Sequence, residues 1–145
     1  MKKIILSLLF IAISFESHAF INDLKNARYL GLGYFDINDT DSSEYQVYLE
    51  FENNQLKGDY VVNDEYYNLN LDFRFHNSDW FDVVYNGQDV GVGFCLKYHC
   101  YYEMEIDAAK YSETMTLVSD FLYRVGYKII GDTIIKWEEK LKKLP

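Results

Sequence analysis

Apolar and polar side chains alternate along two stretches of the chain. The apolar positions are Tyr45, Val47, Leu49 and Phe51 in the first stretch, and Tyr67, Leu69, Leu71, Phe73 and Phe75 in the second. Successive side chains of a β-strand point to opposite faces of its sheet, so a period of two is typical of a strand with one buried face. The pattern predicts antiparallel strands that pack one face on a core.

Polar clusters separate these stretches and supply the residue types that turns require. They occur at residues 38–43, 53–54, 63–64 and 76–79, and Asn86-Gly87 is a strong signal for a two-residue hairpin turn. We therefore predict strands at residues 28–37, 44–52, 56–62, 66–75, 80–85, 88–96 and 100–106. The predicted fold class is all-β, an antiparallel meander that forms a small barrel or sandwich.

The C-terminal forty residues carry two competing periods. Ala108, Tyr111, Met115, Val118, Leu122 and Val125 recur at helical spacing, whereas Tyr123, Val125, Tyr127 and Ile129 alternate as in a strand. β-branched and aromatic side chains favour strands through Ile135, with a hairpin turn at Gly131-Asp132. A short closing helix over residues 134–144 is the competing interpretation of the last segment, with Glu138 and Glu139 four residues before Lys142 and Lys143. The alternative fold is α+β, an antiparallel sheet over residues 28–106 followed by two C-terminal helices.

The N-terminus has the three parts of an export signal: Lys2 and Lys3, an apolar run over residues 4–15, and small residues at Ser17 and Ala19. The apolar run is shorter than the roughly 20 residues that span a bilayer. We therefore predict a signal peptide at residues 1–19, a single acidic β-rich domain at residues 20–145, and no stable membrane insertion after cleavage. The expected location is periplasmic or extracellular.

The two cysteines, Cys95 and Cys100, are separated by four residues in a chain predicted to reach an oxidising compartment. That spacing suits a hairpin whose flanking positions face each other, so we predict a disulfide. Pairing Cys95 with Cys100 would place Gly93 opposite Tyr102 and Val92 opposite Glu103.

The chain is acidic, with a formal net charge of −9. Beyond residue 19 it holds 12 basic and 22 acidic side chains, and residues 20–106 alone hold 5 basic and 16 acidic ones. Nucleic acids and anionic membranes would repel such a protein, whereas a basic protein would be attracted to it. We therefore expect no nucleic-acid partner and favour a basic protein as the partner.

No motif in the sequence indicates a catalytic, cofactor or metal site, and we predict none. Residues 36–41 begin like a calcium loop, but Asp41 occupies the position that needs glycine and Val47 the position that needs a glutamate. His76 and His99 lie in no zinc or triad pattern. A solvated acidic turn explains residues 36–41 more simply.

Aromatic residues make up 18% of the chain, which favours a β core and leaves some rings on the surface. Tyrosines are enriched in recognition surfaces. The candidate partner-binding residues are Tyr48, Glu50, Glu52, Tyr98 and Tyr101. The sequence thus favours a non-enzymatic inhibitor or immunity-type binder of a cationic protein, such as a cell-wall hydrolase or toxin. A β-barrel carrier of a small apolar ligand is the first alternative, and a hydrolase with two inward carboxylates in one cleft is the second.

Overall fold

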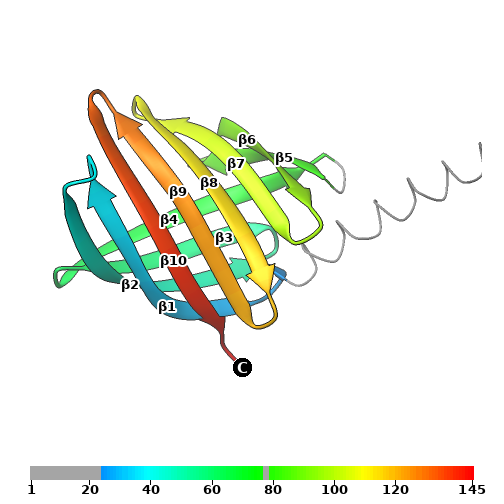
Figure 1. Ribbon diagram of the computed structural model, residues 1–145. Helices are drawn as coiled ribbons and strands as arrows, with labels where there is room; N and C mark the ends of the chain where they lie inside the picture. Colours follow the sequence, from blue (N-terminus) through cyan, green and yellow to red (C-terminus); the bar gives the residue numbers. More distant parts are fainter. Residues whose placement is uncertain (1–23, 77–78) are drawn as a thin grey trace, which may run out of the picture.

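The computed structural model describes residues 24–76 and 79–145, and within them ten antiparallel strands form one closed barrel. Each strand pairs with its neighbours in sequence, and the last strand pairs with the first, so no edge remains open (Figure 1). The strands are β1 (Arg28–Ile37), β2 (Asp41–Glu52), β3 (Gln55–Val62), β4 (Glu65–Phe75), β5 (Trp80–Tyr85), β6 (Gln88–Leu96), β7 (His99–Ile106), β8 (Ala109–Val118), β9 (Phe121–Ile130) and β10 (Thr133–Lys143).

The all-β meander expected from the alternating pattern is therefore confirmed as a barrel. Strands β1, β5 and β6 have the predicted bounds, and β2, β3, β4 and β7 begin one to three residues earlier than predicted. The predicted apolar face of β2 is the inner one, with Tyr45, Val47, Leu49 and Phe51 all buried. The predicted signal peptide at residues 1–19 lies outside the described residues.

The closing helix is wrong, and so is the α+β alternative with two C-terminal helices. Residues 133–143 form strand β10, which pairs with β9 on one side and with β1 on the other. Without β10, both β1 and β9 would expose a row of unpaired backbone groups. Closing the sheet satisfies both edges, and this long-range gain outweighs the few tenths of a kcal/mol that helical Glu–Lys pairs would supply.

Two-residue hairpins account for the tight meander. Asn53-Asn54, Asn63-Asp64, Asn86-Gly87 and Asp107-Ala108 all have positive φ at both turn positions. This conformation matches the twist of the flanking strands, and Asn, Asp and Gly adopt it most readily. The polar clusters that marked turns in the sequence therefore also set the register of the strands they join.

One end of the barrel is closed by a packed core. Leu49, Leu56, Leu71, Leu122 and Leu141 are almost fully buried there. The chain before β1 lies across this end, where Ala27 accepts a backbone hydrogen bond from Phe51 and Leu24 joins the core cluster. We refer to this part of the interior as the packed half.

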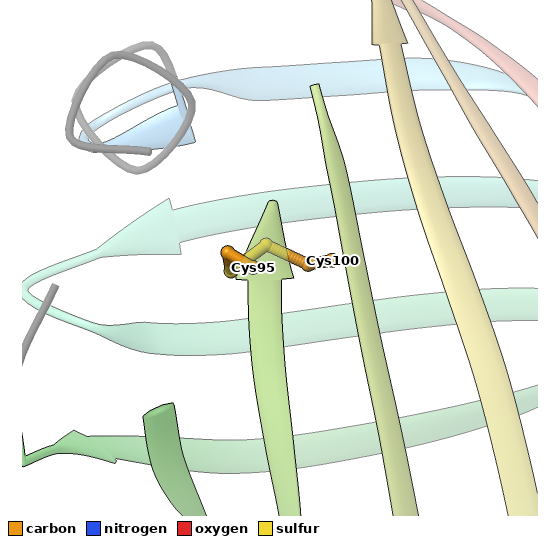
Figure 2. The surroundings of a disulfide bond; sticks show 2 residues. All are labelled: Cys95 and Cys100. Atoms are coloured by element: carbon orange, nitrogen blue, oxygen red, sulfur yellow. A yellow bond between two sulfur atoms is a disulfide. The ribbon is translucent and has the colours of Figure 1, made fainter. Parts of the chain in front are cut away.

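The predicted disulfide between Cys95 and Cys100 is present and belongs to the packed half. Figure 2 shows the two side chains joined where β6 ends and β7 begins. The predicted register is confirmed too, because Gly93 faces Tyr102 and Val92 faces Glu103. The missing side chain at Gly93 matters, since a Cβ atom there would lie 2.3 Å from the Phe81 ring.

Candidate functional site

The other half of the barrel interior is hollow. A cavity of about 330 Å³ reaches the surface at the end where the β3–β4 and β9–β10 hairpins turn. Its wall contains the aromatic residues Phe35, Tyr45, Tyr60, Tyr67, Tyr102, Tyr111 and Trp137, the apolar residues Val62, Leu69, Met104 and Ile135, and the charged residues Glu113, Arg124, Lys128 and Glu139. This volume lies in the range of small-molecule sites. A ten-stranded barrel is wider than the eight-stranded kind that side chains fill, so inward residues alone do not close it.

The floor of the cavity is a buried ion cluster centred on Arg124. The Arg124 guanidinium donates from Nε to Glu113 Oε1 at 2.8 Å and from Nη2 to Glu113 Oε2 at 2.7 Å. Its Nη1 donates to Glu139 Oε2 at 2.6 Å. All three residues are at most 4% exposed. We call Glu113, Arg124 and Glu139 the floor cluster.

Strand register brings the floor cluster together. Its members lie on the adjacent strands β8, β9 and β10, with Glu139 directly opposite Arg124. Glu113 is two residues along from the position opposite Arg124, since Met115 is the partner of Arg124. All three side chains lie on the inner face of their strands, so they meet inside the barrel.

Tyrosine hydroxyls complete the hydrogen bonding of the two carboxylates. Tyr45 donates to Glu139 Oε1 at 2.7 Å, and Tyr102 donates to Glu113 Oε1 at 2.9 Å. Tyr45 lies on β2 and reaches Glu139 on β10 by passing over Gly33 of β1, which is the register partner of both. A Cβ atom at Gly33 would lie 2.4 Å from Tyr45 Cζ, so only glycine leaves this path open.

Tyr60 reaches the floor cluster from β3, on the far side of the interior. Its hydroxyl accepts a hydrogen bond from Arg124 Nη1 at 3.2 Å. Among the described residues the Tyr60 proton has no acceptor, although the Tyr60 ring lines the cavity. Burial raises the pKa of Tyr60 to about 12, so the hydroxyl stays protonated at neutral pH and can donate to a ligand.

The ionisation of the floor cluster follows from its burial. Burial alone would lower the pKa of Arg124, but the charges of Glu113 and Glu139 outweigh it and hold that pKa well above the ordinary value. Burial raises the pKa of Glu139, against the opposing charge of Arg124 and with a smaller contribution from Glu113. The guanidinium is therefore permanently charged, and Glu139 is the carboxyl that holds a proton more readily than usual.

The rim of the cavity is more exposed than the floor, and one lysine there makes a cation–π contact. The Lys128 ammonium lies 5.0 Å from the centre of the Tyr111 ring. Tyr67, on β4, is 50% exposed although it continues the inward face of Leu69 and Leu71. The inward faces of the strands thus pass from full burial to solvent at this end.

The five candidate partner-binding residues do not form one surface. Tyr48, Glu50 and Glu52 lie on β2, whereas Tyr98 lies in the β6–β7 turn and Tyr101 on β7. In the ring of strands β2 and β7 are separated by four strands in either direction. They therefore lie on opposite sides of the barrel, and a single partner footprint cannot centre on both.

The acidic segment at residues 36–41 forms the end of β1 and the turn into β2. Asn38 Oδ1 accepts a hydrogen bond from the backbone of Ile134, and Asp39 pairs with Lys136 at 2.5 Å. These contacts tie the turn to the neighbouring β9–β10 hairpin. Among residues 24–76 and 79–145, no group of three His, Cys, Asp or Glu side chains is arranged to hold a metal ion.

Sequence reasoning missed the floor cluster. Its signal was a charged residue on the apolar face of three successive strands: Glu113 between Tyr111 and Met115, Arg124 after Leu122, and Glu139 between Trp137 and Leu141. The helical interpretation of residues 134–144 hid it, because it placed Glu139 on a solvated face beside Lys143.

Comparison with known proteins identifies the fold and not a family. No protein-family model and no curated protein sequence matches the chain. Among solved structures, the S-type phycobiliprotein lyase CPES from Guillardia theta is similar, with a TM-score of 0.60 and 7% sequence identity over 90% of this chain and 96% of that one. At 7% identity this similarity shows that the two chains share their fold.

The described residues contain no helix long and apolar enough to cross a membrane.

Proposed function

We propose that the protein binds a small, largely apolar ligand inside its barrel. The observation that carries this proposal is the cavity of about 330 Å³, with its wall of aromatic and aliphatic side chains and a few polar groups gathered at the floor. Apolar walls supply affinity through burial of ligand surface, and the floor hydroxyls supply orientation. The signal-peptide pattern and the disulfide support a carrier that works outside the cytoplasm.

The geometry favours this function over the inhibitor hypothesis. The candidate acidic and tyrosine residues are divided between opposite sides of the barrel, whereas the cavity is a single concave site. A protein partner of the acidic surface would leave the cavity and its buried polar floor without a role.

The hydrolase alternative required two inward carboxylates with perturbed pKa values that meet in one cleft. Glu113 and Glu139 do meet there, and burial raises the pKa of Glu139. However, Arg124 lies between them, and each of their four oxygens already accepts a hydrogen bond from Arg124 or a tyrosine. With all four oxygens engaged by Arg124 and the tyrosines, neither carboxylate presents a free oxygen to a substrate proton. The floor cluster is therefore better suited to orienting a ligand than to hydrolysing one.

The experiment is a titration with a neutral fluorescent apolar probe, N-phenyl-1-naphthylamine, against two matched tryptophan variants. Val62→Trp adds an indole to the cavity wall on β3, and Val61→Trp adds the same group on the outer face one residue away. We expect Val62→Trp to weaken binding about tenfold or more by filling the site, and Val61→Trp to bind as the wild type does. No binding to the wild type, or equal binding by both variants, would refute the proposal.

A further inference from the structure

The floor cluster holds one more carboxylate than cations when all its members are ionised. Glu113 and Glu139 share the single guanidinium of Arg124, which donates hydrogen bonds to both. Among the described residues, the other cation on the cavity wall is Lys128. Lys128 is four residues further along β9, about 13 Å at strand spacing, and lies at the rim. The cavity is therefore negative at its floor and positive at its mouth.

Two of the three tyrosine hydroxyls just above the floor suit a hydrogen-bond donor with positive charge. Tyr45 and Tyr102 give their protons to the carboxylates, so their oxygens remain as acceptors. The faces of these rings and of Tyr60 carry negative quadrupole charge, which attracts cations most strongly where water is excluded. Carboxylate charge and ring faces thus favour the same kind of ligand group.

We infer that the ligand of this cavity ends in a cationic group, such as a protonated amine, which lies against the floor cluster while the apolar remainder fills the aromatic wall. This inference rests on the proposed ligand-binding function and specifies the class of ligand. A cation at the floor balances the excess carboxylate charge and leaves Arg124 in place.

The same geometry excludes a fatty-acid type of ligand bound head inward. A ligand carboxylate would bring a third negative charge to one guanidinium whose partners are already Glu113 and Glu139. It would also meet the oxygens of Tyr45 and Tyr102, whose protons are committed elsewhere. Only the Tyr60 proton remains for it among the described floor hydroxyls.

Three probes of equal chain length separate these alternatives: decylamine, decanol and decanoate, each below its aggregation concentration at pH 7. The Trp80→Phe background leaves Trp137, in the cavity wall, as the single fluorescent tryptophan. We expect decylamine to bind about tenfold more tightly than decanol, and decanoate to bind more weakly than decanol.

The outcomes distinguish the two proposals. Equal affinities for the three probes, or tightest binding of decanoate, would overturn the cationic-ligand inference while leaving ligand binding in place. Failure of all three probes and of N-phenyl-1-naphthylamine would instead overturn the proposed function itself.

A matched pair of glutamate variants tests the source of the preference. Glu139→Gln removes the excess charge inside the barrel, whereas Glu138→Gln removes the same charge from the exposed outer face of β10. The readout is the ratio of decylamine to decanol affinity within each variant. We expect this ratio to fall towards one in Glu139→Gln and to keep its wild-type value in Glu138→Gln. A ratio unchanged in folded Glu139→Gln would overturn the inference, and if that variant does not fold, the wild-type probe series decides alone.

Discussion

The two halves of the barrel interior are built from the same strands and the same alternating pattern, yet one is solid and the other hollow. In the packed half, inward side chains such as Leu71 are fully buried and the remaining void is about 30 Å³. In the hollow half, a cavity of about 330 Å³ lies above the floor cluster, and the inward residue Tyr67 is 50% exposed.

The alternating strand pattern is the same in both halves, and additional groups fill the interior of the packed half. The packed half contains the segment at Leu24–Ala27, the disulfide, and the clustered rings of Phe51, Phe73 and Phe81. No such segment of the described chain enters the hollow half. Because a ten-stranded barrel is too wide for its own inward side chains to fill, the end without a plug remains a cavity. The comparison teaches that the packed core and the proposed ligand site occupy different halves of one sheet, with the floor cluster between them.

The largest effect is expected at the boundary between the halves. Arg124→Met would leave Glu113 and Glu139 buried without a counter-ion, and should lower the free energy of unfolding by about 3–5 kcal/mol. Urea unfolding followed by circular dichroism measures this. The triple variant that also carries Glu113→Gln and Glu139→Gln should recover part of the loss, because it buries no unpaired charge. A loss below about 1 kcal/mol in Arg124→Met would show that the boundary is not held by ion pairing.

The comparison of the halves themselves is tested by two leucines on the same face of β4. Leu71 is fully buried in the packed half, and Leu69 lines the cavity two residues away. Leu71→Ala should cost about 3 kcal/mol or more of unfolding free energy, because it creates a new void in a dense core. Leu69→Ala only enlarges an existing space and should cost about 1 kcal/mol. Equal losses in urea unfolding would contradict the division into halves.

The disulfide gives a smaller effect that should stay within the packed half. Replacing both Cys95 and Cys100 by Ala removes a short covalent loop, with an expected loss of about 2 kcal/mol of unfolding free energy. Affinity for N-phenyl-1-naphthylamine should not change, since neither residue lines the larger cavity. Weaker probe binding in the folded double variant would indicate that the two halves are coupled.

The last effect appears only at alkaline pH. The pKa of Tyr60 is raised to about 12, so the folded state keeps a proton that the unfolded chain loses near pH 10. Its contribution to stability is therefore fully present below pH 10 and is lost as the pH rises through 12. Tyr60→Phe should show a shallower loss of stability across this window, measured by urea unfolding at each pH. Ultraviolet titration of tyrosinate should lose its component near pH 12 in that variant, and identical pH profiles would refute the assignment.

Local pattern was sufficient to predict most of the fold. The alternation in β2 and β4 predicted which side chains face inward, and the Asn- and Gly-rich pairs predicted the turns that set register. The spacing of the two cysteines predicted their disulfide, because it fits the geometry of a hairpin. These features depend on residues that are close together in the chain, so a single sequence is enough to predict them.

The candidate site depended on contacts between distant parts of the chain. Only closure of the barrel by β10 against β1 turned Glu139 inward, placed it opposite Arg124, and brought it within reach of Tyr45 across Gly33. The period of residues 134–144 fits a helix as well as a strand, so the sequence alone left the inward position of Glu139 undetermined. The sequence by itself determined an antiparallel meander over residues 28–106 with a bridged hairpin. The tertiary structure decided that the sheet closes, that one half stays hollow, and that a buried charge cluster forms the floor. Each of these depends on contacts between residues far apart in the chain, such as Tyr29 with Lys143 and Tyr45 with Glu139.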